Sequence, residues 1–182
     1  IGATFTAEAI QPGLAFWAGE LGLEYDIRFA GYNQIFQELL NPAGLFAGNR
    51  GGVNVALIRL EDWRVAGVES EARRFVDAVR SSAARFASPL IVVLCPSSAP
   101  EAERIVAEGV ADLPSAHLIT ASEVCHLYPV AEVFDPKADE LGHLPYTPEF
   151  FVALATALAR RMHALRAAPF KVIALDCDNT LW

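Results

Sequence analysis

Hydrophobic and polar positions follow two different periods along this chain, and the two periods alternate. Short apolar runs typical of buried strands predict strands at 1–5, 53–60, 89–95 and 117–120, alternating side chains predict one at 25–29, and 130–134 is a further candidate. Apolar residues at helical spacing predict helices at 12–21, 32–40, 68–86, 99–108 and 148–165. Strands that alternate with helices predict an α/β fold with three layers, in which helices cover both faces of a parallel sheet.

The last stretch of the chain predicts one more strand, and the rest of the sequence is best understood as what precedes it. Residues 172–175 are apolar and lead directly into Asp176 and Asp178. Open α/β sheets bind ligands at the carboxyl ends of their strands, so these carboxylates would mark the site of a second domain. We therefore expect a first domain at 1–166, and a linker with the start of a truncated second domain at 167–182.

Composition narrows the class of protein. Of the 182 residues, 53% are hydrophobic, which is enough for a sizeable core, and the net charge of -8 argues against binding nucleic acid through a basic surface. No apolar run reaches the roughly 20 residues that a membrane span needs. The odd number of cysteines, three, favours a reducing cytoplasm.

Asp176 and Asp178 could divide catalytic work, because two acids at the end of a strand allow one to attack or bind a cation while the other transfers protons. The alternative is a simple junction between a strand and a turn, with Thr180 as a cap. Residues 176–180, Asp-Cys-Asp-Asn-Thr, resemble the first motif of the haloacid dehalogenase (HAD) superfamily.

That resemblance implies roles for the residues of the motif. Asp176 would be the nucleophile and Asp178 the general acid and base. Mg²⁺ would bind the Asp176 carboxylate and the Asp178 main-chain carbonyl, while Thr180 would shape the turn. The later motifs of the superfamily are absent from these 182 residues, so we expect this fragment to need no cofactor and to hydrolyse no phosphate ester.

Nearly the whole chain resembles the FkbH-like family. The segments that carry the resemblance are 5–8, 32–37, 52–55, 59–63, 139–148 and 176–182. The family implies a domain like that of the SGNH hydrolases, with a flavodoxin-like sheet, followed by a HAD domain. Members transfer a glyceryl unit from bisphosphoglycerate to the phosphopantetheine of an acyl carrier protein, in polyketide or nonribosomal peptide biosynthesis. Some members are known only as HAD phosphatases.

Under this resemblance, Cys177 would carry the glyceryl group as a thioester before its transfer. The alternative is a buried strand cysteine, because strand alternation points residue 177 away from the two acids. The expected partners are the downstream HAD domain and the carrier protein, with no nucleic acid and no membrane.

A second candidate site is the pair Glu140 and His143, which resembles the acid and histidine block of SGNH hydrolases, with Asp139 as a rival acid. The nucleophile is the difficulty, since the first strand is followed by Thr4 and Thr6 in place of a serine. His143 would then hold a loop or an interface together by hydrogen bonds.

Four more polar side chains could line the same cleft, and they are Asn33, Gln34, Glu61 and Asp62. For Asn33 and Gln34, local helix capping explains the sequence equally well. Three functions therefore stay open for the first domain. It could be a catalytically silent domain that docks on or closes the HAD site, an esterase or acyltransferase of SGNH type, or an interaction module of an assembly line.

Overall fold

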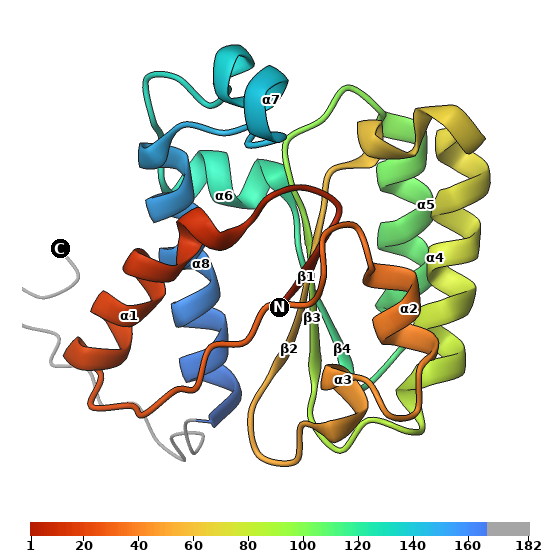
Figure 1. Ribbon diagram of the computed structural model, residues 1–182. Helices are drawn as coiled ribbons and strands as arrows, with labels where there is room; N and C mark the ends of the chain where they lie inside the picture. Colours follow the sequence, from red (N-terminus) through yellow and green to blue (C-terminus); the bar gives the residue numbers. More distant parts are fainter. Residues whose placement is uncertain (167–182) are drawn as a thin grey trace, which may run out of the picture.

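The computed structural model describes residues 1–166, apart from the side chain of Ala66, and its centre is a four-stranded parallel sheet (Figure 1). The strands lie in the order β1-β2-β3-β4, and all three neighbouring pairs are parallel. Their bounds are Gly2–Ala3 for β1, Asn54–Ile58 for β2, Leu90–Leu94 for β3 and Ala116–Ile119 for β4. The predicted α/β fold with a parallel sheet is confirmed.

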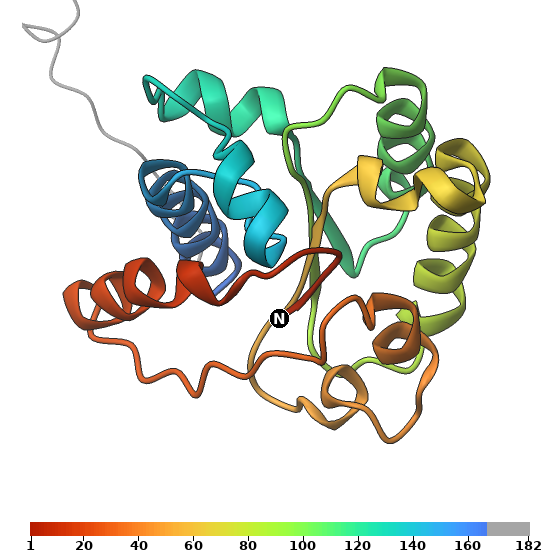
Figure 2. The same ribbon diagram turned by 45° about the horizontal axis from the view of Figure 1, so that its top comes forward.

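Helices cover both faces of this sheet, as Figures 1 and 2 show. One face carries the short 3-10 helix η1 (Glu8–Ile10), α1 (Gln11–Glu20), α6 (Ala121–Leu127) and α8 (Pro148–Arg166). The other face carries α2 (Ile35–Leu40), α3 (Leu45–Gly48), α4 (Val68–Ala83) and α5 (Pro100–Ala111). Two more elements, the 3-10 helix η2 (Leu60–Ala66) and α7 (Pro136–Gly142), lie beyond the carboxyl ends of the strands.

The sheet separates two hydrophobic clusters, because successive side chains of a strand point to opposite faces. In β2, Val55 and Leu57 belong to the cluster under α1 and α8, whereas Ala56 and Ile58 belong to the cluster under α2, α4 and α5. All five residues of β2 are buried, as expected for a strand covered on both faces. Burial on both faces thus explains why the sequence of such a strand is a continuous apolar run.

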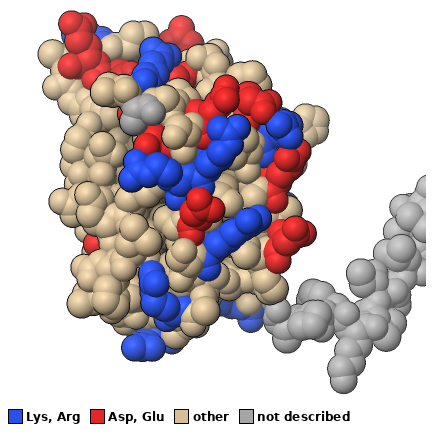
Figure 3. Space-filling view, turned by 90° about the vertical axis from the view of Figure 1, so that its right-hand side faces the viewer, with Lys and Arg blue, Asp and Glu red and all other residues tan. Residues whose placement is uncertain are grey.

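The outer surface of α4 and α5 is charged with both signs interspersed (Figure 3). Arg104 pairs with Glu101 at 2.6 Å and with Glu108 at 2.8 Å, both on its own helix. Such exposed pairs at helical spacing mark a solvated helix face. Arg73 and Arg74 of α4 pair in the same way with Glu69 and Glu71 of their own helix.

Two of the predicted strands were wrong. Residues 25–29 form no strand, and their pairing with the sheet is confined to Ile1, whose nitrogen donates to Arg28 O and whose carbonyl accepts from Ala30 N, both at 2.7 Å. Residues 130–134 contribute a single antiparallel bridge between Phe134 and Tyr146. Within residues 1–166, neither segment forms a ladder of the kind that defines a strand.

Three short helices were missed, and they are α3, α6 and α7. They span four to seven residues, which is too short for a helical period to show in the sequence. The starts of α6 and α7 nevertheless carry ordinary capping signals, Thr120 and Asp135. Asp135 caps α7 by accepting from Ala138 N at 3.0 Å, and Pro136 occupies the first turn.

Candidate functional site

The candidate site lies at the carboxyl edge of the sheet, where three loops meet. Thr4 and Thr6 follow β1, and Arg59 follows β2 directly. The end of α7 brings His143 from far along the chain to the same place. Figure 2 shows how α7 and the chain after β1 and β2 approach one another on this side.

His143 is the centre of a hydrogen-bonded chain. Its Nε2 lies 3.0 Å from Asp62 Oδ1, and its Nδ1 lies 2.5 Å from the Tyr32 hydroxyl. The residue ends α7 in the left-handed conformation, with φ at 50°, which turns the imidazole away from the helix axis toward β2. Both ring nitrogens therefore have partners, and the tautomer decides which nitrogen donates.

Thr6 fixes the main chain that carries His143. Its amide donates to His143 O at 2.9 Å, and its hydroxyl donates to Gly142 O at 2.7 Å. The hydroxyl is therefore used to satisfy a carbonyl at the end of α7, where helices leave such acceptors free. Thr6 is part of the site as a support of the histidine loop.

Arg59 gathers three carboxylates at the same edge. Its Nη1 lies 2.8 Å from Asp139 Oδ2 and 3.6 Å from Asp62 Oδ1, and its Nε lies 3.6 Å from Glu61 Oε2. The Arg59 side chain is only 16% exposed, and that of Asp62 is 7% exposed. The positive guanidinium thus compensates the negative charge of these partly buried carboxylates, which would otherwise destabilise the folded protein.

The electrostatics of the cluster follow from this burial. Burial raises the pKa of the Asp62 carboxyl, and the nearby Thr4 hydroxyl, His143 and Arg59 offset only part of that effect. The pKa of Tyr32 is also raised, first by burial and then by the negative charges of Asp62 and Asp139. Both pKa shifts favour a protonated group, the Asp62 carboxyl at one end of the hydrogen-bonded chain through His143 and the Tyr32 phenol at the other.

Thr4 lies at the end of β1, where the resemblance to SGNH hydrolases would place a serine nucleophile. Its side chain is fully buried, and its hydroxyl accepts from Arg59 N at 3.0 Å and lies 3.4 Å from Arg59 O. These contacts join the ends of β1 and β2. Both ring nitrogens of His143 bond other groups, Asp62 and Tyr32, so this threonine is built into the sheet edge and is not activated by the imidazole.

Glu61 and Glu140 serve other purposes. Glu61 accepts from the main-chain nitrogen and the hydroxyl of Ser98, at 2.5 and 2.8 Å, and so ties the end of β2 to the loop after β3. Glu140 is exposed on α7, and the acid that bonds His143 is Asp62. The predicted pairing of Glu140 with His143 is therefore wrong. The rival acid, Asp139, bonds Arg59 and not the histidine.

Asn33 and Gln34 form the turn before α2. Asn33 has a φ of 53°, in the left-handed region that asparagine tolerates, and Gln34 N donates to Gly31 O at 3.1 Å. Both side chains are exposed, and it is the neighbouring Tyr32 that reaches His143. Sequence reasoning overlooked Arg59 as a site residue, although a charged residue directly after a buried strand was the available signal.

The residues of the HAD-like motif, Asp176, Cys177, Asp178 and Thr180, lie outside the described residues. Within residues 1–166, no group of three or more His, Cys, Asp or Glu side chains is placed to hold a metal ion. Within the same range, no helix is long and apolar enough to cross a membrane.

Comparison with known proteins gives one structural relative. No family model matches the chain, and no curated protein matches its sequence. A crystal structure of the N-terminal part of the protein BF1531 from Bacteroides fragilis, which contains a phosphatase domain and is complexed with Mg, superimposes with a TM-score of 0.75 at 8% identity. The match covers 91% of this chain and 51% of that one, so the chain spans about half of its relative's length. At this identity, the similarity is one of fold.

Proposed function

We propose that residues 1–166 are the SGNH-like N-terminal domain of an FkbH-like protein, and that this domain supports a HAD domain without hydrolysing esters itself. The observation that carries the proposal is the bonding of His143. Its two ring nitrogens contact Asp62 and Tyr32. The hydroxyl of Thr4, at the end of β1, bonds the main chain of Arg59 instead.

An SGNH-type hydrolase needs a histidine with one nitrogen on an acid and the other on a serine hydroxyl. Here a phenol takes the serine's place on the imidazole. Because the pKa of Tyr32 is raised, the phenolate that would attack a carbonyl is disfavoured. The hydrogen-bonded chain then has a structural role, in which it holds the end of α7 against the segments after β1 and β2.

The structural relative supports the proposed arrangement of domains. It is the N-terminal part of a protein, contains a phosphatase domain, and is about twice as long as the matched region. A domain of this fold next to a phosphatase domain is what the FkbH-like resemblance implies. In the complete protein, the HAD domain would transfer a glyceryl unit to the phosphopantetheine of an acyl carrier protein.

Mg²⁺ would belong to that second domain. Oxygen atoms are the ligands that Mg²⁺ prefers, and the Asp176 carboxylate and the Asp178 main-chain carbonyl would offer two of them at the end of a predicted strand. Bound Mg²⁺ would neutralise negative charge on a phosphate. Cys177 between them would carry the glyceryl thioester, and the protein would work in the cytoplasm.

An esterase assay tests the silent cleft. The 182-residue chain should hydrolyse p-nitrophenyl acetate no faster than buffer does, and His143→Ala should leave that rate unchanged. Glu140→Ala is the matched control, since Glu140 lies exposed on the same helix. Turnover that falls in His143→Ala but not in Glu140→Ala would show an active site and support an esterase.

The second test uses the protein that contains the complete HAD domain. Loading of the carrier protein should require Mg²⁺ and should be lost in Asp176→Asn. It should survive His143→Ala if the cleft of the first domain is silent. Retained loading in Cys177→Ala would remove the thioester role of that cysteine without affecting the role proposed for residues 1–166.

A further inference from the structure

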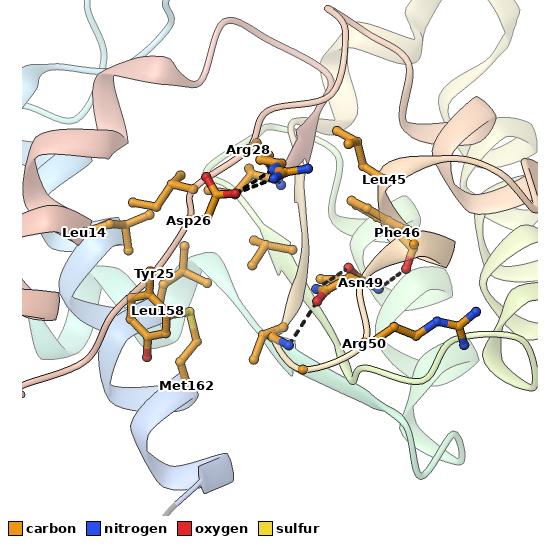
Figure 4. Close-up of a pocket in the computed structure, with 18 of the residues that line it drawn as sticks. Leu14, Tyr25, Asp26, Arg28, Leu45, Phe46, Asn49, Arg50, Leu158 and Met162 are labelled. Atoms are coloured by element: carbon orange, nitrogen blue, oxygen red, sulfur yellow. Dashed lines mark hydrogen bonds and ion pairs between the residues drawn. The ribbon is translucent and has the colours of Figure 1, made fainter.

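The two edges of the central sheet differ in their length and in what borders them. Beside the β1 edge, a cavity of about 660 Å³ lies between α8 and α3, and residues 24–28 form part of its wall (Figure 4). On this side, β1 spans only Gly2–Ala3. At the other edge, β4 spans Ala116–Ile119 and pairs with β3 on one side only. The β4 edge is therefore the longer regular edge of the sheet.

The pairing of β3 with β4 fixes the direction of each main-chain group in β4. Leu90 N donates to Ser115 O at 2.9 Å, and Leu90 is the register partner of Ala116. In a parallel ladder, alternate residues direct their N–H and C=O groups to the same neighbour. Because Ser115 O faces β3, Ala116 and then Leu118 direct their N–H and C=O groups away from β3. The same alternation applies to Thr120, whose backbone is still extended.

Two of these outward groups already have partners within the chain. Ala116 N donates to Leu113 O at 3.0 Å, and Thr120 O accepts from Val124 N at 3.2 Å. The four outward groups that remain are Ala116 O, Leu118 N, Leu118 O and Thr120 N. Among residues 1–166, no main-chain hydrogen bond engages these four groups. The β4 edge thus offers two donors and two acceptors in an alternating row.

The side chains of β4 are compatible with an interface. Ala116 and Leu118 pack against the cluster under α5 and are only partly buried. His117 points to the other face of the sheet. Burial and then the positive Arg161 lower the pKa of His117, which favours the neutral imidazole. Residues 115–120 contain no proline and no Asp, Glu, Lys or Arg, the residue types that protect edge strands from pairing.

The four free groups are self-complementary in one antiparallel register. With Leu118 opposite Leu118 of a second copy, each Leu118 N would donate to the other Leu118 O, and each Thr120 N to the other Ala116 O. The groups left facing each other would be Ala116 N and Thr120 O, which are already bonded within their own chains. A register centred on His117 would set Leu118 O against the bonded Ala116 N. One centred on Ile119 would set Leu118 N against the bonded Thr120 O.

We infer that two copies of this chain associate through β4, by antiparallel pairing about a two-fold axis at Leu118. A two-fold interface uses the same surface on both copies, and the matched donors and acceptors of this edge meet that condition. The contact joins two four-stranded sheets into one and leaves no free β4 edge. On the side of α5, the two Leu118 side chains lie next to each other and bury their remaining surface. This assembly is independent of the function proposed for the histidine cluster.

Sedimentation equilibrium of the 182-residue chain tests the assembly. The mass should rise from that of the monomer to twice that value as the concentration increases. Leu118→Lys places two positive charges opposite each other at the axis, so this variant should stay monomeric at concentrations where the wild type is dimeric. Val152→Lys is the matched control, because Val152 is 56% exposed on α8, and it should form the dimer as the wild type does. Circular dichroism checks that both variants are folded.

A disulfide cross-link tests the register, and it decides the question if Leu118→Lys does not fold. Opposite residues of a hydrogen-bonded antiparallel pair have Cα atoms about 5.5 Å apart, which a disulfide can span. Mild oxidation should therefore link two copies of Leu118→Cys. Ala116→Cys, on the same face of the same strand, should stay unlinked because Thr120 of the second copy lies opposite it. The wild type, oxidised in parallel, gives the background from its own three cysteines.

Three results would overturn the inference. The first is a wild-type chain that stays monomeric at every concentration, and a Leu118 amide protected from hydrogen exchange in that monomer would show that another segment of the same chain covers the edge. The second is a dimer that survives Leu118→Lys. The third is equal cross-linking of Leu118→Cys and Ala116→Cys.

Discussion

Replacing Arg59 with methionine should destabilise the protein more than any other single removal of an arginine from the ion pairs described above. Methionine keeps much of the packing of the side chain but leaves Asp62, Asp139 and Glu61 without their shared cation. Breaking a buried ion pair by removing one partner costs about 3 kcal/mol, and the 16% exposure of Arg59 places it among such cases. For a domain of this size, that corresponds to a fall in melting temperature of roughly 6–12 °C.

The loss should depend on pH in a defined direction. Arg59 lowers the pKa of Asp62 and so offsets part of the larger effect of burial. Without Arg59, the folded-state pKa of Asp62 rises further above its ordinary value of 3.8. An acid with a raised folded-state pKa keeps its full contribution to stability below its unfolded-state pKa and loses it as the pH rises through the folded-state value. The deficit of the variant should therefore grow from pH 4 to pH 7.

Urea denaturation of the wild type and Arg59→Met at pH 4, 5, 6 and 7 would measure this deficit. Arg104→Met is the matched control, because Arg104 also bridges two acids but is 55% exposed. The control should change stability little at any pH. A deficit in Arg59→Met that is the same at pH 4 and pH 7, or that equals the control, would refute the reasoning.

Two further substitutions and one titration should give measurable results. Tyr146→Phe removes a buried hydroxyl that donates to Pro96 O at 3.0 Å, and it should cost about 1–2 kcal/mol in urea denaturation. Gly109→Ala places a Cβ 2.5 Å from a methyl carbon of Val76 between α5 and α4, and it should cost about 1–3 kcal/mol. Because burial and then nearby carboxylates raise the pKa of Tyr32, its phenol should ionise above the ordinary tyrosine range in an ultraviolet titration.

Two of these predictions have a control within the chain. Gly19→Ala adds a Cβ with no atom within 4 Å and should leave stability unchanged or raise it slightly. Asp139→Asn removes one of the charges that act on Tyr32 and should lower the pKa of the phenol. A Tyr32 titration that does not move in Asp139→Asn would contradict the proposed electrostatics, and equal effects of the two glycine changes would contradict the packing argument.

The parallel core was predictable because its strands are buried on both faces. The apolar runs that gave β2 and β3 need only hydrophobicity and length, and both are local properties of the sequence. Residues 25–29 alternate between apolar and polar side chains but form no strand, because a strand also needs a neighbouring strand to pair with. Within residues 1–166, the bonds of this segment to the sheet are the two around Ile1.

The site was predictable in its residues more than in its pairings. His143, Asp62 and Thr6 were each recognised from their place after a strand or before the final helix. Sequence spacing suggested that the nearest acid, Glu140, would bond the histidine. The left-handed end of α7 instead turns His143 toward β2, and a backbone angle of this kind leaves no clear mark in the sequence when the residue is not glycine.

The left-handed end of α7 also makes the length of that helix a variable of the site. The imidazole is aimed by the last turn of α7, and each residue added to or taken from a helix rotates everything beyond it by about 100°. A single insertion between Pro136 and Gly142 would swing His143 away from Asp62 while leaving every side chain of the cluster in the sequence. Natural variation in the length of α7 would therefore separate proteins that form the hydrogen bonds of His143 with Asp62 and Tyr32 from proteins that have these residues but do not bring them together.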